Sequence, residues 1–179
     1  MTKSKSAIVF GATGACGRDL INELVSDARY HRVIAVVRRD VVFEGQVETI
    51  RIPNLSAQSL AEFDVSVDSM FCCLGTTIKQ AGSQRAFREV DEHLVNATID
   101  LAERIKVQHF HLISAAGANA SSMFFYSRIK AKTEAHLKNS NILKWTIYRP
   151  SVLKRKIEGE FRLAERIGEW LMAPFQWIP

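Results

Sequence analysis

The stretch that decides the fold is Ala7-Ile8-Val9-Phe10-Gly11-Ala12-Thr13-Gly14-Ala15-Cys16-Gly17. Its first four residues are apolar without alternation, which is typical of a strand buried on both faces of a parallel sheet. The three glycines let the chain turn sharply, let backbone amides approach a pyrophosphate, and let the following helix, to about Val25, pack closely on the strand. Because strand, glycine loop and helix come in this order, the stretch predicts a nucleotide-binding unit.

The rest of the chain alternates between short β-rich runs and longer helical patterns. After the first strand at 7–10, strands are predicted at residues 33–37, 47–52, 70–74, 110–113 and 145–148. The clearest helix is predicted at residues 85–105, where apolar side chains recur at helical spacing. This alternation predicts an α/β fold, a three-layer doubly wound parallel sheet (Rossmann fold) of about six strands. No repeat or linker interrupts it, so residues 1–179 are interpreted as a single NAD(P)-binding domain.

Composition excludes several classes of protein. The chain has 179 residues, 47% of them hydrophobic and 24% charged, which is ordinary globular usage. No apolar run approaches the roughly 18 residues of a membrane span, and a net charge of +5 without a recognition motif argues against nucleic-acid binding. No metal is expected, because His109 and His111 have no cysteine or acidic residue at ligand spacing. The polar first residues and three cysteines without disulfide spacing predict a cytoplasmic location.

The residues after the second strand bear on the choice of cofactor. An NAD-specific site usually has a carboxylate there to bond the ribose 2′-hydroxyl, whereas this chain has Arg38-Arg39 and only then Asp40. A guanidinium pairs well with a 2′-phosphate through two parallel hydrogen bonds. The sequence therefore favours NADP(H) over NAD(H). Asp40 keeps NAD as an alternative, and two solvated surface arginines are another.

A tyrosine and a lysine form the candidate catalytic pair. Tyr126 and Lys130 are four residues apart, on one face of a predicted helix. A nearby ammonium, together with an oxidised nicotinamide, favours phenolate and is expected to bring the tyrosine pKa toward neutrality. Ser114 ends the fifth strand, where ligands bind in open α/β sheets, so its hydroxyl is a candidate to hold a substrate carbonyl.

These motifs together resemble the short-chain dehydrogenase/reductase superfamily. Further segments are similar to its atypical members in the Tat-interacting-protein family of NADPH-binding proteins, from about residue 6 to residue 172. The segments that carry this closer resemblance are Arg38-Arg39, Cys72-Cys73-Leu74-Gly75-Thr76-Thr77, Ala81-Gly82, Val90-Asp91, His109-Phe110, Gly117-Ala118, Ser121-Ser122, Tyr148-Arg149-Pro150 and Gly168-Glu169-Trp170-Leu171.

The resemblance implies a set of contacts with NADP(H). The phosphates would lie against Gly11, Thr13, Gly14, Ala15, Cys16 and Gly17, and the 2′-phosphate against Arg38 and Arg39. Asn54 and Leu55 would flank the adenine, Leu74, Gly75 and Thr76 would line the cofactor, and Pro150, Ser151 and Val152 would cover the nicotinamide. Lys130 would bond the nicotinamide ribose as well as acidify Tyr126.

Two departures from the family pattern affect the substrate side. Many superfamily members carry two consecutive hydroxyl residues at the serine position, whereas Ala115-Ala116 follow Ser114, so Ser121 or Ser122 is an alternative source of the hydroxyl. Family members also usually continue well past the segment that ends at Leu171. The chain is therefore expected to lack part of the C-terminal region that covers the substrate, either naturally or by truncation.

The sequence thus leads to an NADP(H)-dependent oxidoreductase. Hydride would pass between nicotinamide and a small carbonyl or alcohol substrate, with Tyr126 giving or taking the proton. The alternative is a regulatory module that senses NADP(H) and binds a protein partner without turnover. The apolar residues 170–179 are interpreted as packing over the sheet or substrate crevice, with a contact to a second copy or a membrane surface as the sharper alternative.

Overall fold

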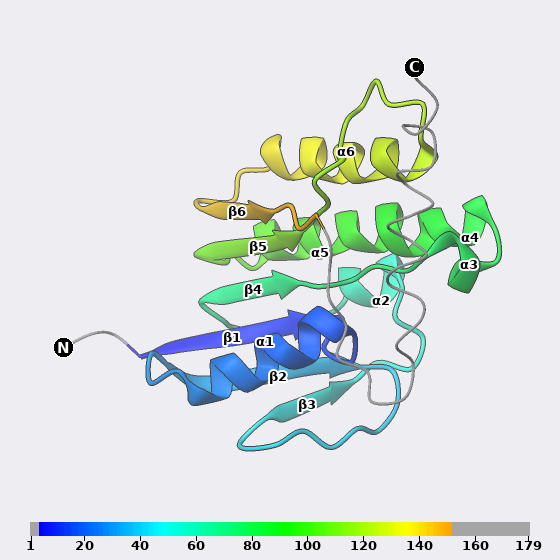
Figure 1. Cartoon of the computed structure of the whole chain (residues 1–179). Coiled ribbons are helices and arrows are strands. Elements are labelled where there is room, and N and C mark those ends of the chain that lie inside the picture. Colours follow the sequence, from blue (N-terminus) through cyan, green and yellow to red (C-terminus); the bar gives the residue numbers. More distant parts are fainter. Residues whose placement is uncertain (1–3, 152–179) are drawn as a thin grey trace.

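A computed structural model describes residues 4–151 and contains a six-stranded parallel sheet (Figure 1). Its strand order is β3-β2-β1-β4-β5-β6, the order of the doubly wound dinucleotide-binding fold. The strands are β1 (Lys5–Phe10), β2 (Tyr30–Val37), β3 (Glu48–Arg51), β4 (Ser69–Cys72), β5 (His109–Ile113) and β6 (Trp145–Tyr148). The predicted fold class is confirmed. The predictions for Val152 and for residues 168–179 lie outside the described residues.

Helices cover the sheet on both faces. They are α1 (Ala15–Ser26), α2 (Ala57–Ala61), α3 (Ile78–Ala81), α4 (Gln84–Arg88), a π-helical segment η1 (Glu89–Leu94), α5 (Val95–Arg104) and α6 (Phe125–Lys138). Figure 1 shows α1 on one side of the sheet, with α5 and α6 running along the other. No helix in residues 4–151 is long and apolar enough to span a membrane.

Alternate side chains of the central strands build two cores. Ile8 and Phe10 of β1 pack on the face that α2, α5 and α6 cover, whereas Ala7 and Val9 pack on the face under α1. All four are fully buried, and burial of a large apolar side chain contributes about 1.5–3 kcal/mol to folding. Burial on both faces explains why this strand has no polar alternation.

Two predicted elements differ from those observed. The strand predicted at 70–74 ends at Cys72, because Cys73 and Leu74 leave the sheet and pass against the glycine loop. The helix predicted at 85–105 is helical along its length, but it widens into the π-helical η1 between α4 and α5. Apolar periodicity does not reveal such a widening, which is frequent at functional sites.

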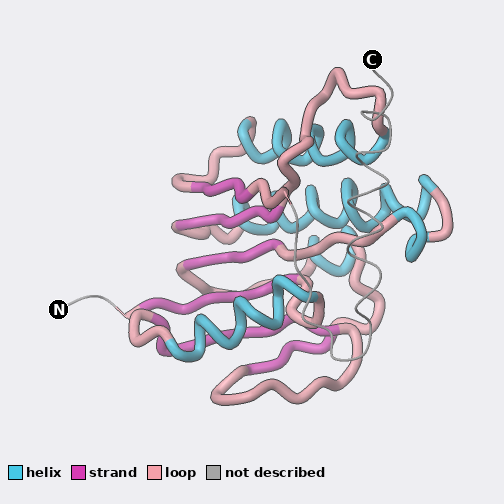
Figure 2. Tube along the Cα trace, in the orientation of Figure 1, coloured by secondary structure: helices cyan, strands magenta, loops and turns pink. Residues whose placement is uncertain are grey.

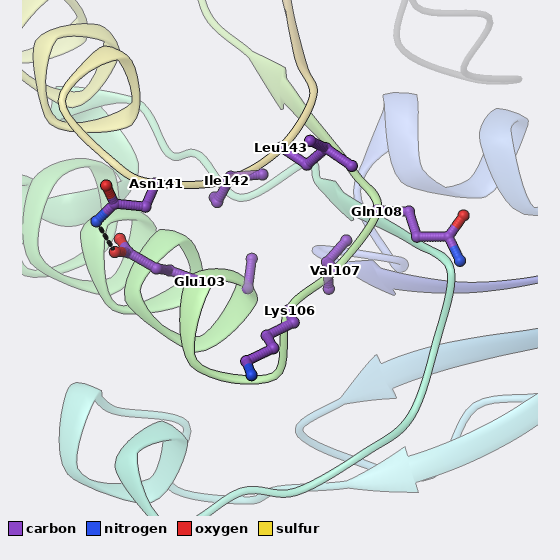
Figure 3. A pocket seen from close by; sticks show the side chains of 8 residues that line it. Glu103, Lys106, Val107, Gln108, Asn141, Ile142 and Leu143 are labelled. Atoms are coloured by element: carbon purple, nitrogen blue, oxygen red, sulfur yellow. Dashed lines mark hydrogen bonds between the residues drawn. The ribbon is translucent and has the colours of Figure 1, made fainter.

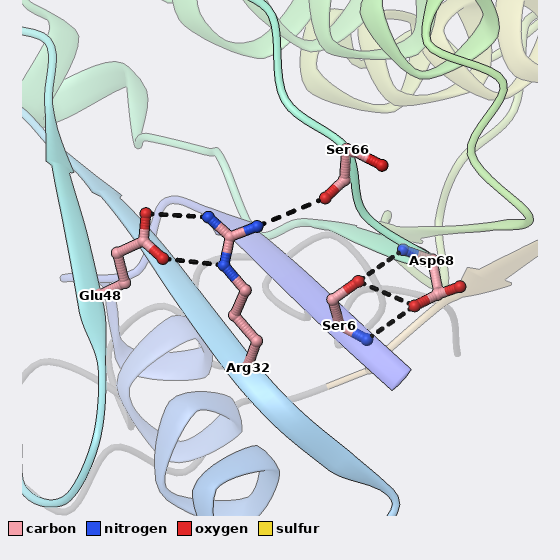
Figure 4. Close-up of polar contacts among 5 residues, drawn as sticks. All are labelled: Ser6, Arg32, Glu48, Ser66 and Asp68. Atoms are coloured by element: carbon pink, nitrogen blue, oxygen red, sulfur yellow. Dashed lines mark hydrogen bonds and ion pairs between the residues drawn. The ribbon is translucent and has the colours of Figure 1, made fainter. Parts of the chain in front are cut away.

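Polar contacts fix the strands at their N-terminal ends (Figure 4). The Asp68 carboxylate accepts hydrogen bonds from the Ser6 backbone N–H and hydroxyl, both at 2.8 Å. Arg32 donates to both oxygens of Glu48 at 2.8 and 3.0 Å, joining β2 to β3. This edge of the sheet is therefore structural, and the opposite edge is left for ligands.

The C-terminal ends of the strands lead into the segments that carry the predicted site. Figure 2 shows a loop after each strand, among them the loop between β5 and α6. Residues 11–14, 38–40, 73–77, 114–124 and 149–151 all follow strand ends. Because the strands are parallel, these segments meet at one edge, where ligands bind in open α/β sheets.

Candidate functional site

The glycine loop is tightly enclosed by backbone. Gly11 has φ +77°, and a Cβ there would lie 2.5 Å from the carbonyl oxygen of Cys73. A Cβ on Gly17 would lie 2.2 Å from the carbonyl oxygen of Gly11. Neither position can hold a side chain unless the backbone moves, so both glycines are required by the close approach of β1, α1 and the chain after β4.

The start of α1 is suited to an anion. Its N-cap is Gly14, so no side chain accepts a hydrogen bond from the first amides, and the first turn contains no acidic residue. The exposed amides and the positive end of the helix dipole favour a phosphate there. Burial raises the pKa of the Cys16 thiol, so this residue adds no negative charge at neutral pH. The loop therefore fits the pyrophosphate that the sequence predicts.

The predicted 2′-phosphate residues lie at the end of β2. Arg38 and Arg39 are exposed, directly after Val37. The carboxylate of Asp40 lies 3.7 Å from Nε of Arg51, the last residue of β3, and both side chains are exposed.

The residues expected at the adenine and along the cofactor follow two other strands. Asn54, after β3, is exposed, and Leu55 is partly buried against the core. Leu74 is likewise packed against the core, and Thr76 is anchored by its backbone N–H. These residues border the same strand-end edge as the glycine loop.

Lys130 is held by a buried carboxylate to which the sequence analysis gave no role. Its Nζ lies 2.7 Å from Oδ1 of Asp91, with side-chain exposures of 7% and 0%. The other carboxylate oxygen accepts the Thr76 N–H at 2.8 Å, and a Cβ on Gly75 would lie 3.7 Å from the ammonium. Burial raises the pKa of Asp91, while the Lys130 ammonium opposes this. Asp91 thereby joins η1, the chain after β4 and α6 at one point.

Asp91 was missed because its sequence signal is faint. It appeared only within Val90-Asp91, a two-residue match in the family resemblance. A full burial of its carboxylate depends on the π-helical turn of η1 and on the packing of α6 against it. A carboxylate inside an otherwise apolar helix stripe is the one signal that could have pointed to it.

Tyr126 lies one turn before Lys130, on the same face of α6. The tyrosine is 39% exposed, and its ring lies 5.9 Å from the Phe87 ring, centroid to centroid. The Lys130 ammonium is 5.8 Å from the centroid of the phenol ring. Burial raises the pKa of Tyr126, and Lys130 opposes this while Asp91 adds to it. The structure places the predicted pair on one face of α6, but the pKa of the phenol is raised, opposite to the expected shift toward neutrality, because burial outweighs the effect of the ammonium.

Ser114 makes a different contact from the one expected. Its buried hydroxyl donates to Oε1 of Glu134 at 2.6 Å. Nε of Arg149 donates to the same oxygen at 2.8 Å, and a second Arg149 nitrogen donates to Oε2. Glu134 lies eight residues after Tyr126, or about 12 Å along the helix axis at 1.5 Å per residue. The alternative serines lie in the loop before α6, where the Ser122 hydroxyl accepts the N–H of Phe124 at 3.1 Å and Ser121 is exposed.

A hollow of about 490 Å³ lies beside these strand ends. It is lined by Cys16, Ile113, Ile147, Tyr148, Arg149 and Pro150. It therefore adjoins both the start of α1 and the chain after β6, and Ser151 follows it as an exposed residue. A smaller cavity of about 190 Å³, where Asn141 bonds Glu103, lies between the ends of α5 and α6 (Figure 3). Because that cavity adjoins the N-terminal ends of β5 and β6, it is remote from the glycine loop.

Comparisons with known proteins identify the family of this chain. The sequence profile of a family described as NAD(P)H-binding matches residues 11–171. The chain belongs to this NAD(P)H-binding family, and a nicotinamide cofactor is the ligand class that the family and the fold support. Protein HTATIP2 of Rattus norvegicus is 31% identical over 177 residues, covering 97% of this chain and 71% of the rat protein. The family resemblance found in the sequence is thus confirmed.

A solved structure and further relatives extend the comparison. The oxidoreductase ylbE from Lactococcus lactis superposes with a TM-score of 0.67 at 18% identity, covering 93% of this chain and 84% of the other, and supports the fold. The chain spans about half the length of some other structures with this fold. Protein FMP52 of Debaryomyces hansenii is 27% identical, covering 90% of this chain and 73% of that protein.

The comparison corrects the expected location. FMP52 and its counterparts in two other yeasts are named as mitochondrial proteins. The expectation of a cytoplasmic protein is therefore wrong as stated. It rested in part on unpaired cysteines, which argue only against an oxidising compartment and do not distinguish one reducing compartment from another.

Proposed function

We propose that the protein is an NADP(H)-dependent oxidoreductase that interconverts a small carbonyl compound and its alcohol. The observation that carries the proposal is that Lys130, with Tyr126 one turn before it on α6, lies close to Gly75 in the chain that follows β4. Lys130 is fixed there by Asp91 at 2.7 Å. A buried lysine paired in this way, next to a partly exposed phenol, suits proton transfer better than simple binding.

The two halves of the fold suggest how a dinucleotide lies across the sheet. The pyrophosphate is expected at the start of α1, between β1 and β4, where the strand order reverses. Arg38 and Arg39 then place the adenosine half over β2 and β3. The other half extends over β5 and β6, where the 490 Å³ hollow adjoins Cys16 and Pro150.

The proton chemistry assigned to this chain falls on Tyr126. When bound, the nicotinamide supplies or accepts the hydride at the carbonyl carbon. In the reductive direction, Tyr126 donates its phenolic proton to the carbonyl oxygen, so that the alcohol forms. The phenol carries this proton at neutral pH, because burial raises its pKa above the ordinary value for tyrosine. The Lys130 ammonium then stabilises the phenolate that is left behind.

Preference for NADP(H) is the second part of the proposal. The support for it is the exposed pair Arg38 and Arg39 at the end of β2. Asp40, the residue that would favour a ribose 2′-hydroxyl, lies 3.7 Å from Arg51, with both side chains exposed. Two guanidiniums at this position favour a 2′-phosphate.

The decisive experiment is a turnover screen of carbonyl compounds with NADPH and NADH, on wild type and on Tyr126→Phe. We expect the phenylalanine variant to bind cofactor as the wild type does and to lose about 10²–10⁴ in rate, the usual contribution of a general acid. A loss smaller than tenfold would remove Tyr126 from the mechanism. Tyr30→Phe is the matched control, since Tyr30 begins β2, at the opposite end of the strands from the glycine loop.

A further inference from the structure

The buried Glu134 carboxylate forms a cluster that the proposed proton chemistry does not use. Glu134 is 2% exposed and receives hydrogen bonds from the Ser114 hydroxyl and from the Arg149 guanidinium. Nζ of Lys138, one turn further along α6, lies 3.8 Å from Oε2. Burial alone would raise the pKa of Glu134, but these hydrogen bonds outweigh it and hold the pKa below its usual range.

The cluster joins three elements at the strand-end edge. Ser114 follows β5, Arg149 follows β6, and Glu134 lies on α6. The backbone after β5 is also hydrogen-bonded to the backbone at the end of β6 and just after it. The Ser114 N–H donates to Tyr148 O at 2.7 Å, and the Ala116 N–H donates to Pro150 O at 3.1 Å. Glu134 thus ties α6 to the point where the chain leaves the sheet after β6.

The position of the cluster beside the hollow says more about its role than the strength of its ion pair does. A buried ion pair is weak support for stability, since apolar residues of similar volume often serve as well. Here Arg149 is bonded to Glu134 on one side, is 46% exposed, and lines the 490 Å³ hollow together with Pro150. The carboxylate therefore fixes a wall of the hollow from behind.

We infer that Glu134 is a positioning residue for the nicotinamide end of the cofactor site, acting through Arg149 and assisted by Ser114. This inference rests on the proposed function, because that function places nicotinamide in the hollow. Ser114 then serves to orient Glu134: its hydroxyl proton is donated to the carboxylate and is not free for a substrate carbonyl. Glu134, the partner of Ser114, lies two turns of α6 away from Tyr126, which agrees with this role.

The test compares two ligands that differ only in the nicotinamide. Calorimetry measures binding of NADPH and of 2′-phospho-ADP-ribose to wild type, Glu134→Gln, Arg149→Lys and Ser114→Ala; NADH and ADP-ribose replace them if NADH binds more tightly. We expect Glu134→Gln and Arg149→Lys to weaken dinucleotide binding at least about tenfold, as for loss of a charged hydrogen bond, and Ser114→Ala to weaken it less. Binding of the ligand without nicotinamide should change less than twofold.

Controls separate positioning from a general loss of structure. Asp100→Asn removes another carboxylate that contacts α6, 2.6 Å from His136, and should leave both affinities unchanged. Arg149→Lys keeps the charge on a half-exposed residue, so it reports even if Glu134→Gln does not fold. The fluorescence of bound NADPH gives an independent readout of how the reduced ring is held.

Two results would overturn the inference. One is unchanged dinucleotide affinity in both Glu134→Gln and Arg149→Lys, and the other is an equal loss of affinity for both ligands. Failure of the proposed function looks different, because the wild type would then turn over no carbonyl compound, even where it binds a nicotinamide cofactor and the two ligands can still be compared. If Ser114→Ala leaves cofactor affinity intact and lowers only the turnover of substrate, Ser114 is a substrate-binding residue and its assignment here is wrong.

Discussion

Replacing Lys130 by methionine should destabilise the protein strongly, because it leaves Asp91 buried without its cation. The two groups are 2.7 Å apart, and their side chains are 0% and 7% exposed. Breaking such a pair by removing one partner costs about 3–5 kcal/mol. A second hydrogen bond to Asp91, from the Thr76 N–H, remains and favours the lower half of that range. We therefore expect a loss of about 3 kcal/mol in the free energy of unfolding.

Urea denaturation followed by circular dichroism measures this loss. Lys132→Met is the matched control, since Lys132 lies on the same helix, is 53% exposed and is 3.4 Å from Glu92; its effect should stay within about 0.5 kcal/mol. Adding Asp91→Leu to Lys130→Met removes both charges. The loss of unfolding free energy in the double variant should be smaller than the sum of the two single losses by at least about 1 kcal/mol.

The pH dependence gives a further check on the Lys130→Met variant. Without its cation, Asp91 has a pKa raised above its value in the unfolded chain, so the variant is penalised at high pH and relieved as Asp91 takes up a proton. The destabilisation should be smaller at pH 5 than at pH 8. A loss below about 1 kcal/mol at pH 8, or no coupling in the double variant, would refute the view of a tightly coupled buried pair.

Three other predictions concern separate parts of the molecule. Gly17→Ala forces a Cβ to within 2.2 Å of backbone, whereas Gly117→Ala meets only an ordinary contact at 3.5 Å, so only the first should impair cofactor binding in a fluorescence titration. Burial lowers the pKa of His111 to about 4 from 6.5. As the pH falls below 6.5, the unfolded chain takes up a proton at His111 before the folded chain does, so the free energy of unfolding decreases, by about 2 kcal/mol at pH 5. His111→Phe should abolish this part of the pH dependence in urea denaturation. The double variant Arg38→Ala, Arg39→Ala should lose most of any preference for NADPH over NADH. Because a charged hydrogen bond contributes about 1.5–3 kcal/mol, the ratio of the two affinities measured by calorimetry should fall at least tenfold. Equal affinities of the wild type for NADPH and NADH would refute the role of the two arginines.

The fold was readable from the sequence because its signals are local. Residues 7–17 combine an apolar strand with a glycine loop, and the glycine positions match the backbone contacts at Gly11 and Gly17. Five further β-rich runs, several of them apolar, predicted the remaining strands to within a few residues. Burial on both faces requires apolar residues in a strand, and tight turns require glycine. Both requirements are therefore visible in the identity of individual residues.

The environment of the site was decided by tertiary structure alone. Spacing on α6 placed Tyr126 near Lys130, but nothing local indicated that Asp91 would meet Lys130 or that Glu134 would receive the Ser114 hydroxyl and the Arg149 guanidinium. These contacts join residues 15 to 39 positions apart on different elements, and they depend on the π-helical turn of η1 and on how α6 packs against the strand ends. Charge and hydrogen-bonding capacity belong to each residue, whereas burial and partners belong to the packed chain. For this reason the sequence could predict Tyr126 and Lys130 as a candidate pair, and only the structure showed what holds Lys130 in place.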